Sequence, residues 1–161
     1  MRELTVVNAV ELAAAYAAAR YAAVLDGDTL LLQVGQPATD LEAYWPAERY
    51  VFITAWNPAS EPRSDTANAA ADALLLAQID RYRAARLPAW AESPDGQWRE
   101  PGWLLADLDG DTSDRLAIEF GQAAILAWRR GEPVRLRMLM EPSSDADDDS
   151  NAACIDWMGS R

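Results

Sequence analysis

Two kinds of hydrophobic pattern alternate along the first part of the chain. Apolar residues recur at a helical spacing after Asn8, a typical N-cap residue, and predict a helix that ends at the Asp26-Gly27-Asp28 turn; its buried side is formed by Leu12, Tyr16, Ala19 and Ala23. Residues 29–34 form a short apolar run that predicts a strand, and residues 41–46 read as a connection. Residues 49–56 are almost continuously apolar and predict a strand at the centre of a sheet, buried on both faces.

The later elements follow from the same patterns. Ser64 is a typical N-cap residue, and the apolar positions after it predict a long helix that reaches residue 86. The remaining predictions are an extended segment at residues 87–90, a turn-rich segment at 92–102, a strand at 103–108, a helix at 111–120 and a hairpin formed by residues 122–128 and 134–140.

Helices and strands do not alternate regularly in this order, which favours an α+β fold, with α/β as the alternative. We expect a single domain over residues 1–140, built on a mixed sheet of about five to six strands with roughly two or three helices packed on it. Residues 141–161 hold six acidic residues and one Arg, and we expect them to be a disordered acidic tail.

Composition narrows the range of functions. All 14 cationic side chains are Arg, and the absence of His and Lys excludes imidazole bases, imidazole metal ligands and catalytic lysines within this chain. The net charge of −12 disfavours general nucleic-acid binding and anionic membranes. The lone Cys154 and the lack of a signal peptide or a long apolar run lead us to expect a cytoplasmic protein. No cofactor is expected, and the oligomeric state stays open.

The leading candidate site lies where the buried strand gives way to the long helix. It consists of Asn57, Ser60, Arg63, Ser64 and Asn68. If Ser64 caps the helix, Asn68 lies one turn further along the same face, beside backbone N–H groups that favour an anion. In the alternative interpretation, Asn57 forms a turn, Ser64 only caps and Asn68 bonds to the loop backbone.

A second set of candidates lies further along the chain. Glu100 stands between Trp98 and Trp103, where an aromatic pocket would raise the pKa of its carboxyl group toward that of a general acid. The alternative is a surface glutamate in a turn above two core tryptophans. Gln122, just after Gly121, could face the same place from the start of a strand or pair with the backbone.

Two charged clusters are weaker candidates. The acidic run at residues 107–114 does not match a calcium loop, because Thr112 and Ile118 stand where such a loop has its Gly and its final Glu, so no metal site is predicted. Arg129, Arg130, Arg135 and Arg137 are expected to form a solvated strand face, with a phosphate-rich partner or the chain's own acidic tail as the alternatives.

Three segments form a recognisable combination: Thr54-Ala55-Trp56-Asn57-Pro58-Ala59-Ser60 with Ser64 and Asn68, Trp98-Arg99-Glu100 leading to Trp103-Leu104, and Phe120-Gly121-Gln122-Ala123-Ala124-Ile125. Together they resemble an uncharacterised bacterial family, domain of unknown function 3293 (DUF3293). The resemblance spans residues 47–128 and implies no activity, because the family has none assigned.

We therefore expect a module that binds a small polar or anionic ligand at a strand-to-helix junction. Two alternatives stay open: a domain that docks a protein partner through a Trp-rich patch, and an enzyme that uses Glu100 without His or Lys. The predicted ligand-binding residues are Asn57, Ser60, Arg63, Ser64, Asn68, Trp98, Glu100 and Gln122.

Overall fold

The computed structural model describes residues 9–58, 61–141 and 154–158. The helices in these ranges are α1 (Ala9–Ala18), α2 (Thr39–Tyr44), α3 (Asp65–Arg81) and α4 (Gly110–Glu119). The strands are β1 (Arg20–Leu25), β2 (Asp28–Leu32), β3 (Arg49–Ile53), β4 (Ala85–Glu92), β5 (Arg99–Ala106), β6 (Ala124–Arg129), β7 (Leu136–Met138) and β8 (Ile155–Trp157).

All the described strands belong to one 8-stranded sheet with the order β2-β1-β4-β5-β3-β6-β7-β8. Neighbouring strands are antiparallel except β7 and β8, which are parallel. This mixed sheet confirms the α+β class and the central position of the strand that contains Val51 and Phe52. The expected five to six strands were too few, and the described residues contain four helices rather than two or three.

The sheet curls, and one of its faces is concave. The chain just after β2 bridges to the chain just before β7, although these strands are far apart in the strand order. Gly35 donates a backbone hydrogen bond of 2.8 Å to Val134, and Val134 donates one of 2.9 Å to Gln36. These contacts draw the two sides of the sheet together around an apolar interior.

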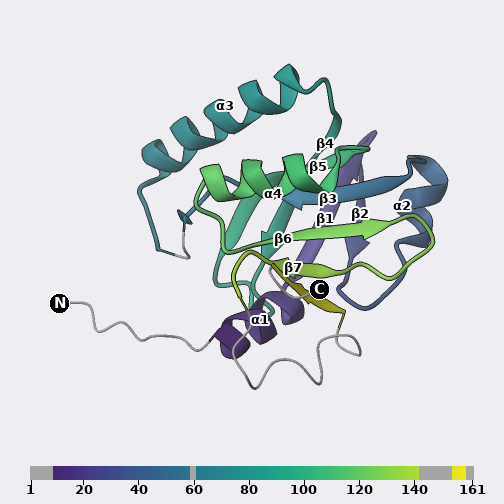
Figure 1. Cartoon of the computed structure of the whole chain (residues 1–161), viewed down its shortest axis with the longest axis horizontal. Coiled ribbons are helices and arrows are strands. Elements are labelled where there is room, and N and C mark those ends of the chain that lie inside the picture. Colours follow the sequence, from purple (N-terminus) through teal and green to yellow (C-terminus); the bar gives the residue numbers. More distant parts are fainter. Residues whose placement is uncertain (1–8, 59–60, 142–153, 159–161) are drawn as a thin grey trace.

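Each face of the sheet has its own core. Tyr21, Phe52 and Leu104 belong to the cluster on the concave face, which α1 and α2 cover with Ala13 and Leu41. The opposite face packs against α3 and α4; its buried residues include Val51, Ile53, Leu75, Leu105 and Leu116. Figure 1 shows α3 and α4 together on one side of the sheet, with α1 on the other.

Three of the sequence predictions were wrong in the assignment of elements. Residues 20–25 form β1 instead of continuing the first helix, because β1 pairs on both edges, with β2 and with β4. The long helix ends at Arg81 instead of residue 86, and Arg83 adopts a left-handed conformation (φ 55°) before β4 begins. Residues 39–44, within and before the expected connection, form α2.

The predicted hairpin at residues 122–140 is confirmed, with Val134, Leu136 and Met138 buried on one face. On the other face Arg135 donates to Asp156 (2.8 Å) and Arg137 donates to Asp114 (2.7 Å). These two arginines are therefore ion-paired rather than solvated.

The sheet extends past the expected domain boundary at Met140. Within the predicted tail, the structure describes Glu141 and residues 154–158, and Ile155–Trp157 form strand β8 at the edge of the sheet. Cys154 is buried. The rest of the predicted tail lies outside the described residues.

Candidate functional site

The junction between β3 and α3 begins with a turn fixed by Thr54. The Thr54 hydroxyl donates to the carbonyl of Pro101 (2.7 Å) and accepts from the backbone N–H of Trp56 (3.1 Å). Asn57 follows in the left-handed region (φ 47°), which asparagine tolerates better than most residues. These contacts turn the chain out of the sheet directly after its most buried strand.

Asn57 and Asn68 then hold the loop against the first turn of α3. The backbone N–H of Asn57 donates to Asn68 Oδ1, and Asn68 Nδ2 donates back to Asn57 Oδ1, each at 2.9 Å. The backbone N–H of Arg63 also donates to Asn57 Oδ1 (2.9 Å). Asn68 is only 1% exposed, and Ser64 accepts from the backbone N–H of Ala67 as the N-cap. The polar side chains on this side are therefore bonded within the protein.

The remaining polar group of Asn57 points to Glu100. Asn57 Nδ2 donates to Glu100 Oε1 at 2.9 Å, whereas Glu100 Oε2 has no hydrogen-bond partner among the described residues. The carboxyl group is half-buried, and this burial raises its pKa, an effect that the Asn57 hydrogen bond partly offsets. Glu100 therefore keeps one oxygen available to accept a hydrogen bond.

Gln122 reaches the same place from the end of α4. Gln122 Nε2 donates to the carbonyl of Trp56 (3.1 Å), and its backbone N–H donates to Ala117 (2.9 Å). Gly121 permits this turn because its φ is +68°, and a Cβ at this position would lie 2.9 Å from the Cβ of Pro58. The end of α4 is thus fitted closely against the junction.

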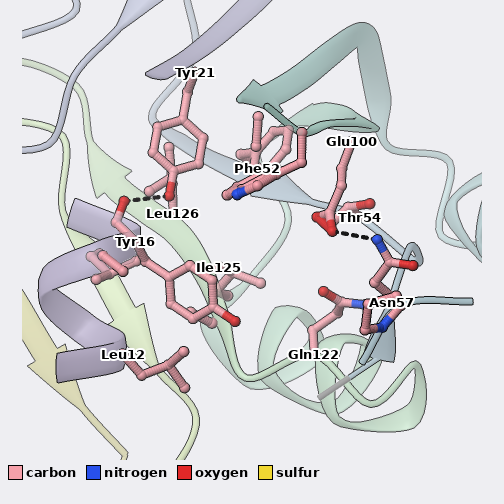
Figure 2. Close-up of a pocket in the computed structure, with 16 residues that line it drawn as sticks. Leu12, Tyr16, Tyr21, Phe52, Thr54, Asn57, Glu100, Gln122, Ile125 and Leu126 are labelled. Carbon is pink, nitrogen blue, oxygen red and sulfur yellow. Dashed lines mark hydrogen bonds between the residues drawn. The ribbon is translucent and has the colours of Figure 1, made fainter. Parts of the chain in front are cut away.

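These residues form one end of a cavity of about 420 Å³ that opens over the concave face of the sheet. Figure 2 shows Leu12 and Tyr16 of α1 on one side of it and Asn57, Glu100 and Gln122 on the other. Its lining residues are Leu12, Ala15, Tyr16, Tyr21, Phe52, Thr54, Asn57, Pro62, Ala91, Trp98, Glu100, Gln122, Ala124, Ile125, Leu126 and Leu136. Among them, Glu100 is the one residue with a carboxyl or guanidinium group.

Aromatic rings form much of the cavity wall. Tyr21 and Phe52 meet edge to face with ring centroids 5.5 Å apart. The Tyr21 hydroxyl donates to the carbonyl of Tyr16 (2.6 Å), and burial raises the pKa of Tyr21. Tyr21 is therefore a neutral part of the wall at physiological pH.

The structure separates the predicted site residues into two groups. Asn57, Trp98, Glu100 and Gln122 line the cavity, and Trp98 is 41% exposed at its mouth. The residues that do not line it are Arg63, Ser64 and Asn68. Ser60 lies outside the described residues.

Sequence reasoning did not single out the apolar side of the cavity. Tyr16 and Leu12 were assigned to the buried side of the first helix, which was correct, but nothing in their spacing pointed to a cavity. Tyr21 was placed in a helix. The one signal available was the aromatic character of Tyr16, Tyr21 and Phe52, which is equally typical of a core.

The acidic run at residues 107–114 has a structural use. Asp109 caps α4 by accepting from the backbone N–H of Thr112 (2.8 Å), and Asp107 accepts from the backbone N–H of Glu48 (2.7 Å). The described part of the chain contains no group of three or more His, Cys, Asp and Glu side chains that could hold a metal ion.

Two tryptophans of the predicted Trp-rich patch, Trp98 and Trp103, lie on different faces of the sheet. Trp103 packs on the side covered by α3, where its indole N–H donates to Asp72 (3.0 Å) and Arg86 lies over its ring. Trp98 lies on the cavity side. These two residues therefore do not form a common patch. The docking of a protein partner stays a prediction.

The fold and the site together define an α+β protein with a polar-ended cavity at a strand-to-helix junction. A family model described as "Protein of unknown function (DUF3293)" matches residues 53–125, so this region of the chain is similar to that family. The match confirms the resemblance seen in the sequence and includes every predicted site residue.

No curated protein and no solved structure matches the chain. None of the helices in the described ranges combines the length and the apolar character needed to cross a bilayer.

Proposed function

We propose that the protein is a binding module for a small molecule, and that the ligand occupies the cavity between α1 and the β3–α3 junction. The supporting observation is the position of Glu100, a half-buried carboxylate with an open oxygen at the polar end of an otherwise apolar cavity. A volume of about 420 Å³ lies in the range typical of small-molecule sites.

The composition of the cavity supports binding over catalysis. General acid–base chemistry usually needs a second titratable group of suitable pKa near the first. Along the described lining, the other titratable side chains are Tyr16 and Tyr21, and the raised pKa of Tyr21 keeps its hydroxyl protonated. Glu100 is thus placed to orient a ligand.

The lining also limits the charge that the polar end of the ligand can carry. From the sequence, this end could be anionic or polar and uncharged. A carboxylate repels an anion, and the N-terminal end of α3 is already capped by Ser64 and occupied by the Asn57–Asn68 pair. The cavity therefore favours a ligand that donates hydrogen bonds over one that carries negative charge.

A thermal-shift screen of small metabolites tests this function. A ligand present at a hundred times its dissociation constant stabilises the protein by about 2.7 kcal/mol, which corresponds to a rise in Tm of about 8 °C for a chain of this size. Ala15 lines the cavity from an exposed position on α1, so Ala15→Phe should block the cavity and abolish the shift.

Ala14→Phe is the matched control. Ala14 is an exposed neighbour on the same helix and does not line the cavity, so its variant should keep the full shift. A ligand that stabilises both variants equally would bind elsewhere and would contradict the proposal. A broad screen that finds no stabilising compound would contradict it as well.

A further inference from the structure

We propose that the ligand of this cavity is a small organic cation, in which an ammonium group contacts Glu100 and an apolar body lies against Tyr16, Tyr21 and Phe52. This inference rests on the proposed binding function and adds the chemical class of the ligand.

The first support is an uncompensated negative charge. No arginine is among the described residues that line the cavity, although the chain has 14 in all. Arg99, the neighbour of Glu100, holds its guanidinium 3.9 Å from the centre of the Trp90 ring. A half-buried carboxylate without a counter-charge is costly, and a cationic ligand would supply the missing charge.

The second support is the set of hydrogen-bond acceptors. An ammonium group has up to three N–H donors and no acceptor. Glu100 Oε2 is open to accept a hydrogen bond. Gln122 Nε2 donates to the carbonyl of Trp56, so Gln122 Oε1 remains as an acceptor. Figure 2 shows the Gln122 and Glu100 side chains on the same side of the cavity. Asn57 Nδ2 donates one hydrogen bond to Glu100 itself, and Gln122 Nε2 donates to the carbonyls of Trp56 (3.1 Å) and Phe120 (3.4 Å).

The third support is the aromatic wall. Tyr16, Tyr21, Phe52 and Trp98 surround the cavity, and aromatic faces attract cations as well as burying apolar surface. The net charge of −12 acts in the same direction, because it raises the local concentration of cations and lowers that of anions. The negative charge, the hydrogen-bond acceptors and the aromatic walls of the cavity thus all favour an organic cation.

Three probes of nearly equal size test the inference: 2-phenylethylamine, 2-phenylethanol and phenylacetate. Isothermal titration at pH 7.5 should rank the amine first, the alcohol second and the carboxylate last. Glu100→Gln should weaken the amine about tenfold or more, since a hydrogen bond to a charged group is lost, and should leave the alcohol within about twofold.

A second measurement needs no variant. The wild-type protein should lose its preference for the amine over the alcohol as the pH falls through the raised pKa of Glu100, because the amine stays protonated while the carboxylate becomes neutral. This arm decides the question even if Glu100→Gln does not fold.

The outcomes separate the two proposals. If the amine and the alcohol bind equally, or the carboxylate binds best, and Ala15→Phe still abolishes binding, the cation inference is overturned and the binding function stands. If none of the three probes binds, the cation inference is overturned, and the broad screen alone decides the binding function.

Discussion

Asn68 and Glu100 both bond to Asn57, yet they lie in opposite surroundings. Asn68 is 1% exposed, and both ends of its side-chain amide bond back to Asn57. Glu100 is half-buried, accepts one bond from Asn57 and keeps its second oxygen open toward a cavity. One Asn57 side chain thus joins a closed network to an open one.

The contrast between Asn68 and Glu100 divides the polar residues of the junction into two kinds. A polar side chain whose bonds are all made within the protein stabilises the loop and has nothing left for a ligand. A polar side chain held in place by one bond, with another group open, is oriented for recognition. The closed network is Asn57, Ser64 and Asn68; the open one is Glu100 and Gln122.

The largest expected loss of stability follows from a substitution in the closed network. Asn68→Ala removes both bonds to Asn57 and leaves buried polar groups unsatisfied, so the free energy of unfolding should fall by about 3 kcal/mol. Urea denaturation measures the loss. Gln78→Ala, a change at a half-exposed position of α3, is the control and should alter stability by less than about 0.5 kcal/mol. Equal stability of the two variants would show that the Asn57–Asn68 bonds do not stabilise the fold.

Gly121→Ala tests whether the junction tolerates a looser fit against α4. The new Cβ would lie 2.9 Å from Pro58, and the positive φ of +68° disfavours any residue with a side chain, so a loss of about 2 kcal/mol is expected. Gly110→Ala is the matched control. Its Cβ would meet nothing within 4 Å, and it should be neutral or stabilise by about 0.5 kcal/mol. A harmless Gly121→Ala would mean that α4 does not brace the junction.

Two features beside the closed network, the central strand and the N-cap, were accessible from the sequence because they are local. The continuous apolar run around Val51 and Phe52 predicted a central strand, and the structure buries its two faces in different cores. Ser64 was predicted as an N-cap and serves as one. Such features depend on neighbours within a few positions, which is the range that a sequence pattern describes.

The wrong assignments have a different physical origin. Residues 20–25 continue the helical spacing of the first helix, but Ala22 and Ala23 are completely buried in β1, and Ala23 packs in the cluster on the concave face. Tertiary pairing here overrides a strong helix propensity. Residues 87–90, by contrast, were predicted as extended and belong to β4, where Pro88 pairs with Trp103 of β5.

The cavity depends on contacts that no local pattern reports. Leu12 and Tyr16 come from the first helix, whereas Glu100 and Gln122 come from segments far along the chain. Their meeting requires the sheet to curl, which rests on the bridge between Val34 and Val134. The sequence could name the polar residues of the site but could not separate the open group from the closed one.

Ser64→Ala should cost about 1 kcal/mol, the usual value for the loss of an N-cap. The penalty should be the same at pH 7 and pH 3, because a serine cap does not titrate. Asp109→Asn at the start of α4 is the comparison. Hydrogen bonds from Thr112 lower the pKa of Asp109, so its contribution is present above the ordinary carboxyl pKa and is lost as the pH falls. A pH-dependent penalty for Ser64→Ala would link this residue to a titrating group and break the division into two networks.

The smallest effect on stability, and the one with the opposite sign, is expected at Glu100. Burial raises its pKa in the folded protein, so its favourable contribution exists below the ordinary pKa of a glutamate and is lost as the pH rises through the folded pKa. Glu100→Gln keeps an acceptor for Asn57 and removes the buried charge, so it should raise Tm slightly at pH 7 and have no such effect below the unfolded pKa.

Glu119→Gln, an exposed change, controls for the loss of one negative charge from an acidic protein. If Glu100→Gln were instead destabilising at neutral pH, the carboxylate would be holding the fold, and Glu100 would belong with Asn68 in the closed network.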